Sequence, residues 1–559
     1  MSLRVARPAW LAGYRRTWWR GDLVAGITVT AYLVPQVMAY ADLAGLPAAT
    51  GLWAAVGALT AYALVGTSPI LSAGPESTTA LMTAAALGAA GASAGRGPEL
   101  AVALAFAVAV LCLLGWLGHL SALAQLLSRP VLVGYMAGIA AIMVMSQLGK
   151  LIGATTTADT FLGQGRELAG HLADSHLPTL VVGVTTLVVM LAGAALWPRA
   201  PMALVGMLGA TAAVSLLHLT EHGVRVIGDI PTGLPRPGVP DLSGSELLSM
   251  LGPALGIAFV AYTDNILTAR SFATRRGERV DARRELLAVG AANLGAALLH
   301  GFPVSSSGSR TAIADASGAR SQLAGLVTVV VTVVSLWTLE PVLSAFPAAA
   351  LAAVVVYAAV RLVDVAEFRR YAAFRRSELV LALGTTLAVV LVGVLIGVLV
   401  AIGLSVLDLL RRVARPHDAI EGFVPGLAGM HDVDDFPEAV AVPGLVIYRY
   451  DSPLFFANAE DFHTRARAAA AGEDVRWFVL NTEAIVEVDI TAVDALEALR
   501  QELAGRGIVF GLARIKQDLR TDLAPSGLLE RIGEDHLFPT LPTTVEAFRA
   551  WEQTHPRTG

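Results

Sequence analysis

Long apolar segments dominate this chain and constrain its fold more than any other feature. A helix needs about 20 mostly apolar residues to cross the hydrocarbon layer of a membrane. Segments close to that length run at roughly 22–41, 49–66, 99–118, 131–148, 178–196, 202–218, 251–269, 286–299, 323–338, 347–361, 378–393 and 395–410. Only 15% of the 559 residues are charged, whereas soluble domains carry about 25%. The sequence therefore predicts an α-helical polytopic protein of the cell membrane.

Two shorter apolar pieces, about 76–92 and 304–316, contain Ser and Thr and raise the expected number of membrane segments to about fourteen. Arginines gather in the loops near 270–284 and 361–376 and in the tail that begins at Arg411. Positive residues mark the cytoplasmic side of membrane proteins, so this alternation places both termini in the cytoplasm. The N-terminal cluster consists of Arg4, Arg7, Arg15, Arg16 and Arg20.

The character of the chain changes after about residue 415. Expected strands at 446–450, 477–480 and 508–513 alternate with expected helices at 459–471 and 491–504. Alternation of this kind predicts a small α/β domain. We expect four parts, which are a cytoplasmic N-terminus at 1–21, a transmembrane domain at 22–413, a linker at 414–440 and the α/β domain at 441–556.

Several kinds of catalytic motif are missing from the sequence. There is no phosphate-binding loop, no nucleophile elbow and no Cys/His spacing of a metal site. The one cysteine, Cys112, cannot form an intramolecular disulfide. These absences argue against an ATP-driven pump and against an enzyme, and we expect no cofactor and no nucleic-acid partner.

A polar stretch, Gly301–Thr311, lies between two apolar segments. Polar residues at membrane depth are costly unless they line a cavity enclosed by protein. We expect Pro303 to open a helix, so that Ser305, Ser306, Ser307 and Ser309 lie at its N-terminus, where free N–H groups favour an anion. A surface loop with a helix cap is the alternative.

An internal repeat supports the binding interpretation. Pro75 and Pro303 precede similar polar turns and are 303 − 75 = 228 residues apart. The same offset takes Gln36 to Asp264, and Tyr40 to position 268, which is Thr268. Seven segments are an odd number, so the second repeat (about 251–413) is expected to be inverted relative to the first (about 22–218). In inverted-repeat transporters, broken helices meet near the midplane and point their N-termini at an anionic substrate.

The chain resembles the SulP family of sulfate permeases and solute-carrier anion transporters. The resemblance covers nearly the whole chain, and its motifs are Val34–Ala41, Ser72–Pro75, Arg129–Val131, Gly301–Thr311 and Ser317–Arg320, with Pro453–Ala459 resembling the STAS domain that closes these proteins. It implies two inverted seven-segment repeats, a moving core domain, a fixed gate domain, alternating access and a homodimer. The substrate site that it implies consists of Gln36, Tyr40, Glu76, Ser77, Thr78, Thr268, Ser305, Ser306, Ser307, Ser309 and Arg310.

Three charged residues of that site leave alternatives open. Arg310 can contact the anion or pair with a carboxylate. Asp264 can carry a coupling proton, bind sodium together with Thr268, or serve as a static partner of Arg310. Glu76 departs from the neutral or aromatic residue expected after Gly-Pro. It is either protonated when the anion binds, which gives proton symport, or an ordinary first-turn acid.

We expect a secondary active anion transporter that takes up sulfate by proton-coupled symport, with the elevator-like movement that the resemblance implies. Bicarbonate or a dicarboxylate, with proton or sodium coupling, is the alternative. A passive anion channel is a second class. A third is a membrane-tethered regulator whose STAS domain binds a cytoplasmic protein. In that domain, Thr491 follows Asp489 at a position where related regulators carry a phosphorylated serine, and we expect a helix cap there instead.

Overall fold

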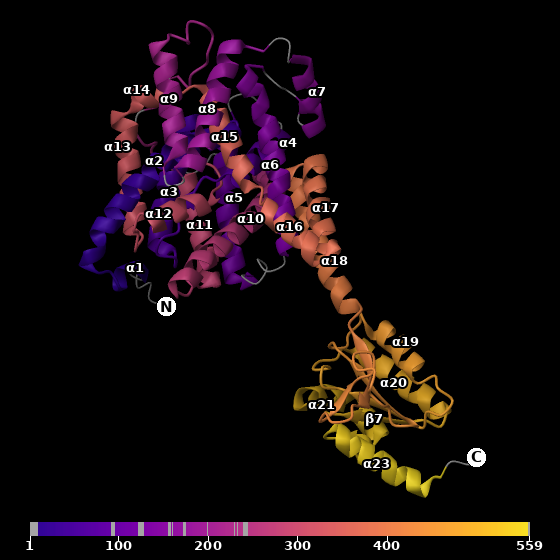
Figure 1. Cartoon of the computed structure of the whole chain (residues 1–559). Coiled ribbons are helices and arrows are strands. Elements are labelled where there is room, and N and C mark those ends of the chain that lie inside the picture. Colours follow the sequence, from indigo (N-terminus) through magenta and orange to yellow (C-terminus); the bar gives the residue numbers. More distant parts are fainter. Residues whose placement is uncertain are drawn as a thin grey trace. The chain divides into compact units, whose positions relative to one another are not determined.

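The computed structural model describes residues 9–90, 96–120, 128–154, 158, 160–171, 175–197, 200–228, 230–231, 233–238 and 244–556 (Figure 1). Arg4 and Arg7 of the predicted basic cluster lie outside these residues. The chain divides into two compact units, Met1–Ser405 and Val406–Gly559. The division falls within a helix, α18, and not at the predicted start of a linker at 414.

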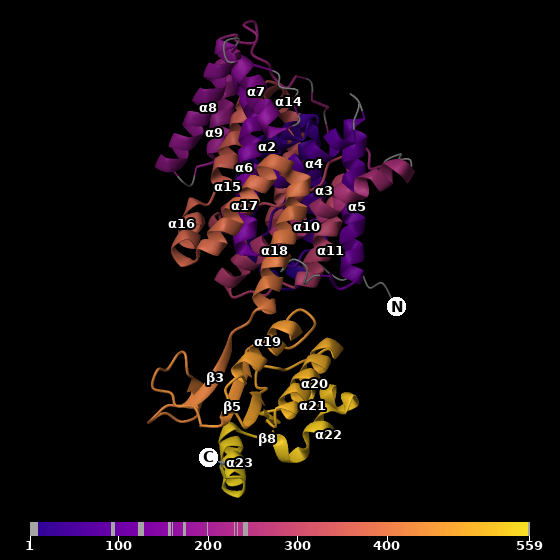
Figure 2. The ribbon, with the colours of Figure 1, turned by 90° about the vertical axis from the view of Figure 1, so that its right-hand side faces the viewer.

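The membrane unit contains two bundles of helices that each pack mainly within themselves. The first bundle comprises α2 (Trp19–Leu43), α3 (Ala48–Val65), α4 (Ser77–Ala89), α5 (Gly97–Leu117), α10 (Gly244–Arg276), α11 (Ala282–Leu298), α12 (Gly308–Ala316) and α13 (Leu323–Thr338). The close packing of α3, α5 and α11 is visible in Figure 2.

The second bundle comprises α6 (Arg129–Ile152), α8 (Leu177–Leu196), α9 (Met202–Leu216), α15 (Ala348–Leu362) and α17 (Arg376–Val392). α18 (Val394–Ala414) follows it. Short helices lie at α1 (Ala9–Ala12), η1 (Arg16–Trp18), α7 (Phe161–His171), α14 (Glu340–Ser344) and α16 (Val365–Phe374). Figure 1 shows α6, α8 and α15 beside one another.

One helix corresponds to each of the fourteen predicted membrane segments. Seven helices in the described part are long and apolar enough to cross a membrane, and two shorter apolar helices are Met202–Leu216 and Leu323–Thr338. The polytopic helical fold is therefore confirmed. The sequence patterns did not predict α7 and α16, because both are amphipathic and lie in segments that were assigned to loops.

Glycines allow the closest helix contacts in both bundles. A Cβ on Gly57 of α3 would lie 2.1 Å from the carbonyl oxygen of Gly295 of α11, and a Cβ on Gly295 would lie 2.4 Å from that of Gly57. In the second bundle, a Cβ on Gly134 of α6 would lie 2.1 Å from the carbonyl oxygen of Ala382 of α17. Small residues let membrane helices approach backbone to backbone, which strengthens their van der Waals packing.

Two buried carboxylates are structural. Glu285 accepts hydrogen bonds from the Tyr62 hydroxyl at 2.9 Å, from Asn265 Nδ2 at 2.6 Å and from the Thr67 backbone N–H at 2.8 Å. Asp22 accepts from the backbone N–H of Arg320 at 2.7 Å and from the Ser321 hydroxyl at 2.7 Å. A buried charge that is fully hydrogen-bonded ties its neighbours together.

The second unit is an α/β domain built on a six-stranded sheet with strand order β4-β3-β5-β6-β7-β8. Its strands are β3 (Asp418–Phe423), β4 (Met430–Asp432), β5 (Leu445–Tyr450), β6 (Trp477–Asn481), β7 (Val509–Ala513) and β8 (Leu537–Phe538). Its helices are α19 (Ala459–Ala469), α20 (Ile490–Gly505), α21 (Gln517–Leu523), α22 (Leu528–Ile532) and α23 (Leu541–Thr554). Alternate residues of β6 enter two separate cores. Phe478 and Leu480 pack with α20, and Trp477 and Val479 pack with α23.

Two predictions for this domain are tested by its geometry. The linker prediction for 414–440 is wrong in part, because residues 418–423 and 430–432 form β3 and β4 and the former pair with β5. The helix cap is confirmed, because the Asp489 carboxylate accepts a hydrogen bond from the Ala492 N–H at 2.9 Å at the start of α20.

Glu497 provides a pH-sensitive contribution to the stability of this domain. Hydrogen bonds from Arg500 to Glu497, both 2.9 Å long, lower the pKa of the Glu497 carboxyl from 4.5 to about 2. Because the folded-state pKa is depressed, the stabilisation is present above pH 4.5 and is lost as the pH falls toward 2.

We predict that Glu497→Gln lowers the free energy of unfolding of the fragment 415–559 by about 1.5–3 kcal/mol at pH 7, the usual range for hydrogen bonds to charged groups. The difference from the wild-type fragment should close between pH 4.5 and 2. Urea denaturation across this pH range measures it, with Glu530→Gln, an exposed residue of α22, as the control. A difference that does not change with pH would contradict the assignment.

Candidate functional site

Two half-helices of the first bundle begin at a pair of very short antiparallel strands. β1 (Ala73–Gly74) pairs with β2 (Ser305–Ser306), with Ala73 opposite Ser306 and Gly74 opposite Ser305. α4 follows β1 and α12 follows β2. Because the strands are antiparallel and each leads into its own helix, the two helices leave the crossing in opposite directions. This is the arrangement that an inverted repeat predicts.

The start of the second half-helix differs from the prediction. Pro303 does not open α12, which begins at Gly308 with Ser307 as its N-cap residue. Asn293 of α11 instead holds the segment extended, because its Nδ2 donates to the Val304 carbonyl at 3.0 Å and its Oδ1 accepts from the Val304 N–H at 2.9 Å. Ser305 and Ser306 consequently belong to β2 and not to the first turn of a helix.

The offset between the repeats is also different at this crossing. The first residues of α4 and α12 are 308 − 77 = 231 residues apart, three more than the proline offset of 228. The coincidence of Gln36 with Asp264, and of Tyr40 with Thr268, therefore does not follow from the alignment of the half-helices. Pro75 and Pro303 occupy different positions relative to their helices.

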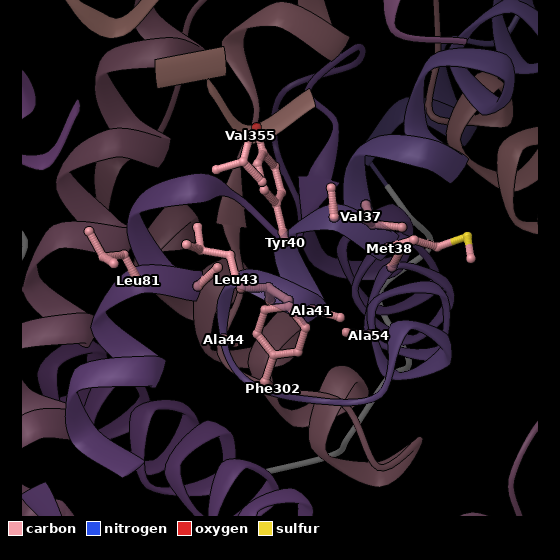
Figure 3. Close-up of a cluster of buried hydrophobic side chains, with 14 of the residues drawn as sticks. Val37, Met38, Tyr40, Ala41, Leu43, Ala44, Ala54, Leu81, Phe302 and Val355 are labelled. Carbon is pink, nitrogen blue, oxygen red and sulfur yellow. The ribbon is translucent and has the colours of Figure 1, made fainter. Parts of the chain in front are cut away.

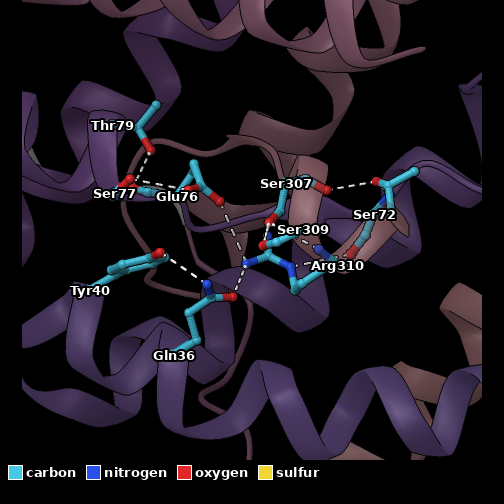
Figure 4. Close-up of polar contacts among 10 residues, drawn as sticks. Gln36, Tyr40, Ser72, Glu76, Ser77, Thr79, Ser307, Ser309 and Arg310 are labelled. Carbon is cyan, nitrogen blue, oxygen red and sulfur yellow. Dashed lines mark hydrogen bonds and ion pairs between the residues drawn. The ribbon is translucent and has the colours of Figure 1, made fainter. Parts of the chain in front are cut away.

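Arg310 lies at the centre of the crossing and is fully buried (Figure 4). Its Nη1 donates to Gln36 Oε1 at 3.0 Å and its Nε donates to the Ser72 hydroxyl at 3.3 Å. Its Nη1 also lies 3.8 Å from Glu76 Oε2. Its Nη2 has no hydrogen-bond partner among the described residues. A buried guanidinium N–H without a partner is costly and is therefore available to an acceptor on a ligand.

The absence of a side chain at Gly74 leaves space for the Arg310 guanidinium. A Cβ at position 74 would lie 3.2 Å from Arg310 Nη2, the nitrogen that lacks a partner. Any larger side chain at this position would press on the guanidinium.

Glu76 precedes α4 in extended conformation, and its side chain does not cap the helix in the described structure. Its Oε1 accepts a hydrogen bond from the Ser77 hydroxyl at 3.1 Å, and its Oε2 has no hydrogen bond there. The Glu76 side chain is 14% exposed, so it does not face solvent as an ordinary first-turn acid would. Among the described residues, the carboxylate that pairs with Arg310 is that of Glu76 and not that of Asp264.

Asp264 lies on α10, which contacts β2. The groups that act on it electrostatically include Glu76 and the Ser305 hydroxyl. Ser305 itself donates to the Ala261 carbonyl of α10 at 3.2 Å. Thr268 lies one turn further along α10 and is partly buried. The described residues contain no cluster of three His, Cys, Asp or Glu side chains that could hold a metal ion, so sodium binding at Asp264 and Thr268 stays a prediction.

The remaining predicted residues do not all contact Arg310. Tyr40 belongs to the Arg310 network, because Gln36 Nε2 donates to the Tyr40 hydroxyl at 3.0 Å. Ser307 lies 3.2 Å from Ser309, measured between the hydroxyl oxygens, and Ser309 is exposed. Thr78 points elsewhere, toward the sulfur of Met136 on α6 at 3.9 Å.

Ser72 and Asn293 were not predicted as site residues, although both are indispensable to this geometry. Ser72 binds Arg310 Nε through its hydroxyl, and its carbonyl accepts the Ser307 N–H at 3.0 Å. The buried Ser306 hydroxyl has no partner among the described residues. Ser72 lies three residues before Pro75, so the polar turn there was the available signal. Asn293, eleven residues from Val304, is one of the residues that carry the family resemblance, but nothing in the sequence indicated its contact with Val304.

The chain is similar to the Sulfate permease family over residues 19–385, and residues 436–544 match the STAS domain. A probable sulfate transporter of Mycobacterium tuberculosis is 54% identical over 541 residues, which cover 96% of this chain and 96% of that protein. The chloroplastic sulfate transporter 4.1 of Arabidopsis thaliana is 30% identical over 98% of this chain and 82% of its own length.

Two solved structures share the fold. The murine solute carrier 26 family member A9, an anion transporter in the inward-facing state, has a TM-score of 0.89 at 21% identity and covers 97% of this chain and 93% of that chain. The transmembrane domain of the cyanobacterial bicarbonate transporter BicA has a TM-score of 0.61 at 22% identity and covers 70% of this chain and 98% of that chain.

We predict that Asn293→Ala destabilises the protein, because the Val304 N–H and C=O then lack partners at a cost of about 1–3 kcal/mol each. Asn293→Asp, which keeps the acceptor and removes the donor, should have an intermediate effect. Thermal unfolding of the purified proteins in detergent compares the melting temperatures of wild type, Asn293→Ala and Asn293→Asp. Equal melting temperatures for wild type and Asn293→Ala would contradict the role of this side chain.

Proposed function

Because the chain is a bacterial member of the sulfate permease family with a C-terminal STAS domain, we propose that it carries sulfate across the cell membrane by secondary active transport. Family membership makes it a multi-pass transporter of a small anion and not an enzyme. The observation that carries the proposal is the buried Arg310, whose Nη2 has no partner among the described residues. The names of its relatives support sulfate over bicarbonate.

The proposed binding position of the oxyanion is between the two half-helices, α4 and α12. Arg310 supplies a fixed positive charge and a free N–H donor. Ser309 and the exposed start of α12 at Gly308 supply a hydroxyl and backbone N–H groups at a helix N-terminus, where an anion is favoured. Gln36 holds the guanidinium in place through Nη1, so that the free nitrogen keeps its direction.

Glu76 is the group that couples the anion to a proton. Its carboxylate lies 3.8 Å from Arg310 Nη1 and therefore competes with an arriving anion for the guanidinium. Protonation removes the competing charge and lets the anion take its place, which gives proton–anion symport. The alternative is sodium coupling through Asp264 and Thr268, which the position of Asp264 behind Ser305 leaves open.

The division of the membrane unit supports an elevator-like movement. The site residues belong to the first bundle, and the contact of Thr78 with Met136 of the second bundle is weak. A stronger contact between the bundles is the ion pair of Lys150 with Asp42. We propose that the first bundle is the core and the second the gate. A homodimer, cytoplasmic termini and a STAS domain that binds a cytoplasmic protein belong to the same proposal. The resemblance and the arginine-rich loops support them.

We predict that proteoliposomes containing the protein accumulate radiolabelled sulfate against its gradient when a proton gradient is imposed. Arg310→Gln should abolish uptake. Arg310→Lys should reduce it at least about tenfold, since a lysine does not reproduce the planar donor fork. Arg320→Lys is the matched control, because Arg320 is exposed and its contact with Asp22 is made by its backbone.

Separate proton, sodium and anion gradients distinguish the alternatives. Accumulation on a sodium gradient alone would favour Asp264 and Thr268 as the coupling site. Downhill flux alone, with no accumulation on either gradient, would favour a channel. Preference for bicarbonate or a dicarboxylate in competition would replace sulfate as the substrate.

A second prediction concerns coupling. Glu76→Gln removes the competing charge permanently, so uptake should lose its dependence on external pH, and accumulation on a proton gradient should disappear while downhill exchange of sulfate continues. Initial rates between pH 5 and 8 measure this effect. Unchanged pH dependence in Glu76→Gln would exclude Glu76 as the proton carrier.

A further inference from the structure

The membrane unit contains a second polar feature, a cavity of about 950 Å³ at the opposite end of α4 from Arg310. The first bundle contributes Asp42 and Leu87 to its lining, and the second contributes Gln147, Lys150 and His176. A helix rises 1.5 Å per residue, so Leu87 lies about 15 Å along α4 from Ser77. The cavity is therefore separate from the Arg310 site.

Apolar side chains lie between the cavity and the central site. Leu43 follows Tyr40 on α2, Leu81 lies between Ser77 and Leu87 on α4, and Val355 lies on α15 (Figure 3). All three are at most 6% exposed. Leu43 itself lines the cavity, and Leu81 lies on α4 between the Arg310 end and the cavity end of that helix.

The electrostatics of the cavity favour an anion. Its lining contains Lys150 and Arg225 against one carboxylate, that of Asp42. It also contains residues of the first turns of α5, α8 and α15 and of the last turns of α2, α4 and α6. Helix N-termini carry partial positive charge and C-termini partial negative charge, so the two sets offset one another. The preference for an anion therefore rests on the two basic side chains.

Lys150 joins the two bundles at the wall of this cavity. Its Nζ lies 2.6 Å from Asp42 Oδ2 and 3.4 Å from the Asp42 carbonyl oxygen, at the end of α2. Both side chains are about one-third exposed. Lys150 and Lys516 are the only lysines among 40 basic residues of the sequence. A lysine is a compact point charge on a flexible stem, so it can change partners where a guanidinium fork is fixed.

Gln147 adds an independent indication of a ligand. Its side chain is 2% exposed and lines the cavity, and its Oε1 has no partner among the described residues. Its Nε2 donates to the Ser146 hydroxyl at 3.2 Å. The free oxygen can accept a hydrogen bond from a water in the hydration shell of a bound anion.

We propose that this cavity is an access subsite for a hydrated divalent oxyanion, in which Lys150 exchanges the Asp42 carboxylate for the anion. The volume is sufficient, because a water molecule occupies about 30 Å³. The role of the subsite in transport rests on the proposed function. In the proposed orientation, the ends of α2 and α6 lie on the extracellular side, so the anion binds here before it reaches Arg310. Breaking the Lys150–Asp42 pair also frees the first bundle to move against the second.

The two lysines allow a test that does not depend on transport. The purified full-length protein is treated with an amine-acetylating reagent in sodium sulfate or in sodium gluconate of equal ionic strength. Mass spectrometry gives the acetylation rates of Lys150 and Lys516. At four times Kd, about one fifth of the subsites are free, so sulfate should slow acetylation of Lys150 about fivefold. The rate at Lys516, an exposed residue of the other unit, should not change.

The same measurement on Arg310→Gln separates binding in the cavity from a movement caused by the central site. Protection of Lys150 that persists in this variant supports the subsite. Protection that disappears, acetylation that sulfate does not slow, or acetylation that it accelerates would each overturn the proposal. Protection without uptake of sulfate by proteoliposomes would leave the subsite intact and reject the proposed function.

Uptake by cells gives the kinetic consequence. Lys150→Gln should raise KM for external sulfate about tenfold, at the low end of the range for loss of electrostatic attraction, with a smaller effect on the maximal rate. Lys150→Arg should restore a low KM, and Asp42→Asn should lower it, because the competing carboxylate is gone. Arg236→Gln removes a charge of the exposed segment before α10 that does not line the cavity and should leave KM unchanged. Equal KM values for wild type and Lys150→Gln would contradict the subsite.

Discussion

The central site is arranged around one buried guanidinium, that of Arg310, which makes only some of the hydrogen bonds it could donate. Arg310 is surrounded by a hydroxyl, a carboxamide oxygen and a carboxylate at 3.8 Å, and one of its nitrogens has no partner among the described residues. A buried charge needs most of its hydrogen bonds to be tolerated. Glu285 illustrates the alternative, since donors from α3, α10 and the turn after α3 satisfy its carboxylate. The buried carboxylate of Glu285 is therefore fully paired, whereas the buried guanidinium of Arg310 keeps one nitrogen without a partner among the described residues.

Much of the membrane fold could be predicted, because the bilayer requires long apolar segments. The boundaries of α13 at 323 and 338 are those expected from the sequence. The other membrane helices differ by at most four residues at either end, except α10, which extends seven residues further at both ends. The α/β domain was also predictable in outline, from the buried strands β5, β6 and β7. β3 and β4 were missed because they are the two outer strands on one side of the sheet, where the pattern is polar and short, as in the segment Asp418–Phe423.

The central site was predicted in composition but not in geometry. Pro303 was expected to open a helix because proline is common at a first turn, yet proline also suits extended backbone. A distant side chain, Asn293, decides between the two by pairing with Val304. Two-residue strands such as β1 and β2 leave no periodic signal. The pairing of Glu76 rather than Asp264 with Arg310 likewise depends on three-dimensional placement that spacing along the chain does not contain.

The antiparallel pairing of Gly74 with Ser305 has a consequence for the way in which the site can open. The two halves of the site come from opposite halves of the chain, and the backbone hydrogen bonds between β1 and β2 join them. Separating the two halves at this pairing would break these backbone hydrogen bonds at membrane depth, where no water can take the place of the lost partners. The proposed elevator-like movement keeps these hydrogen bonds, because the paired strands β1 and β2 then move together as one unit.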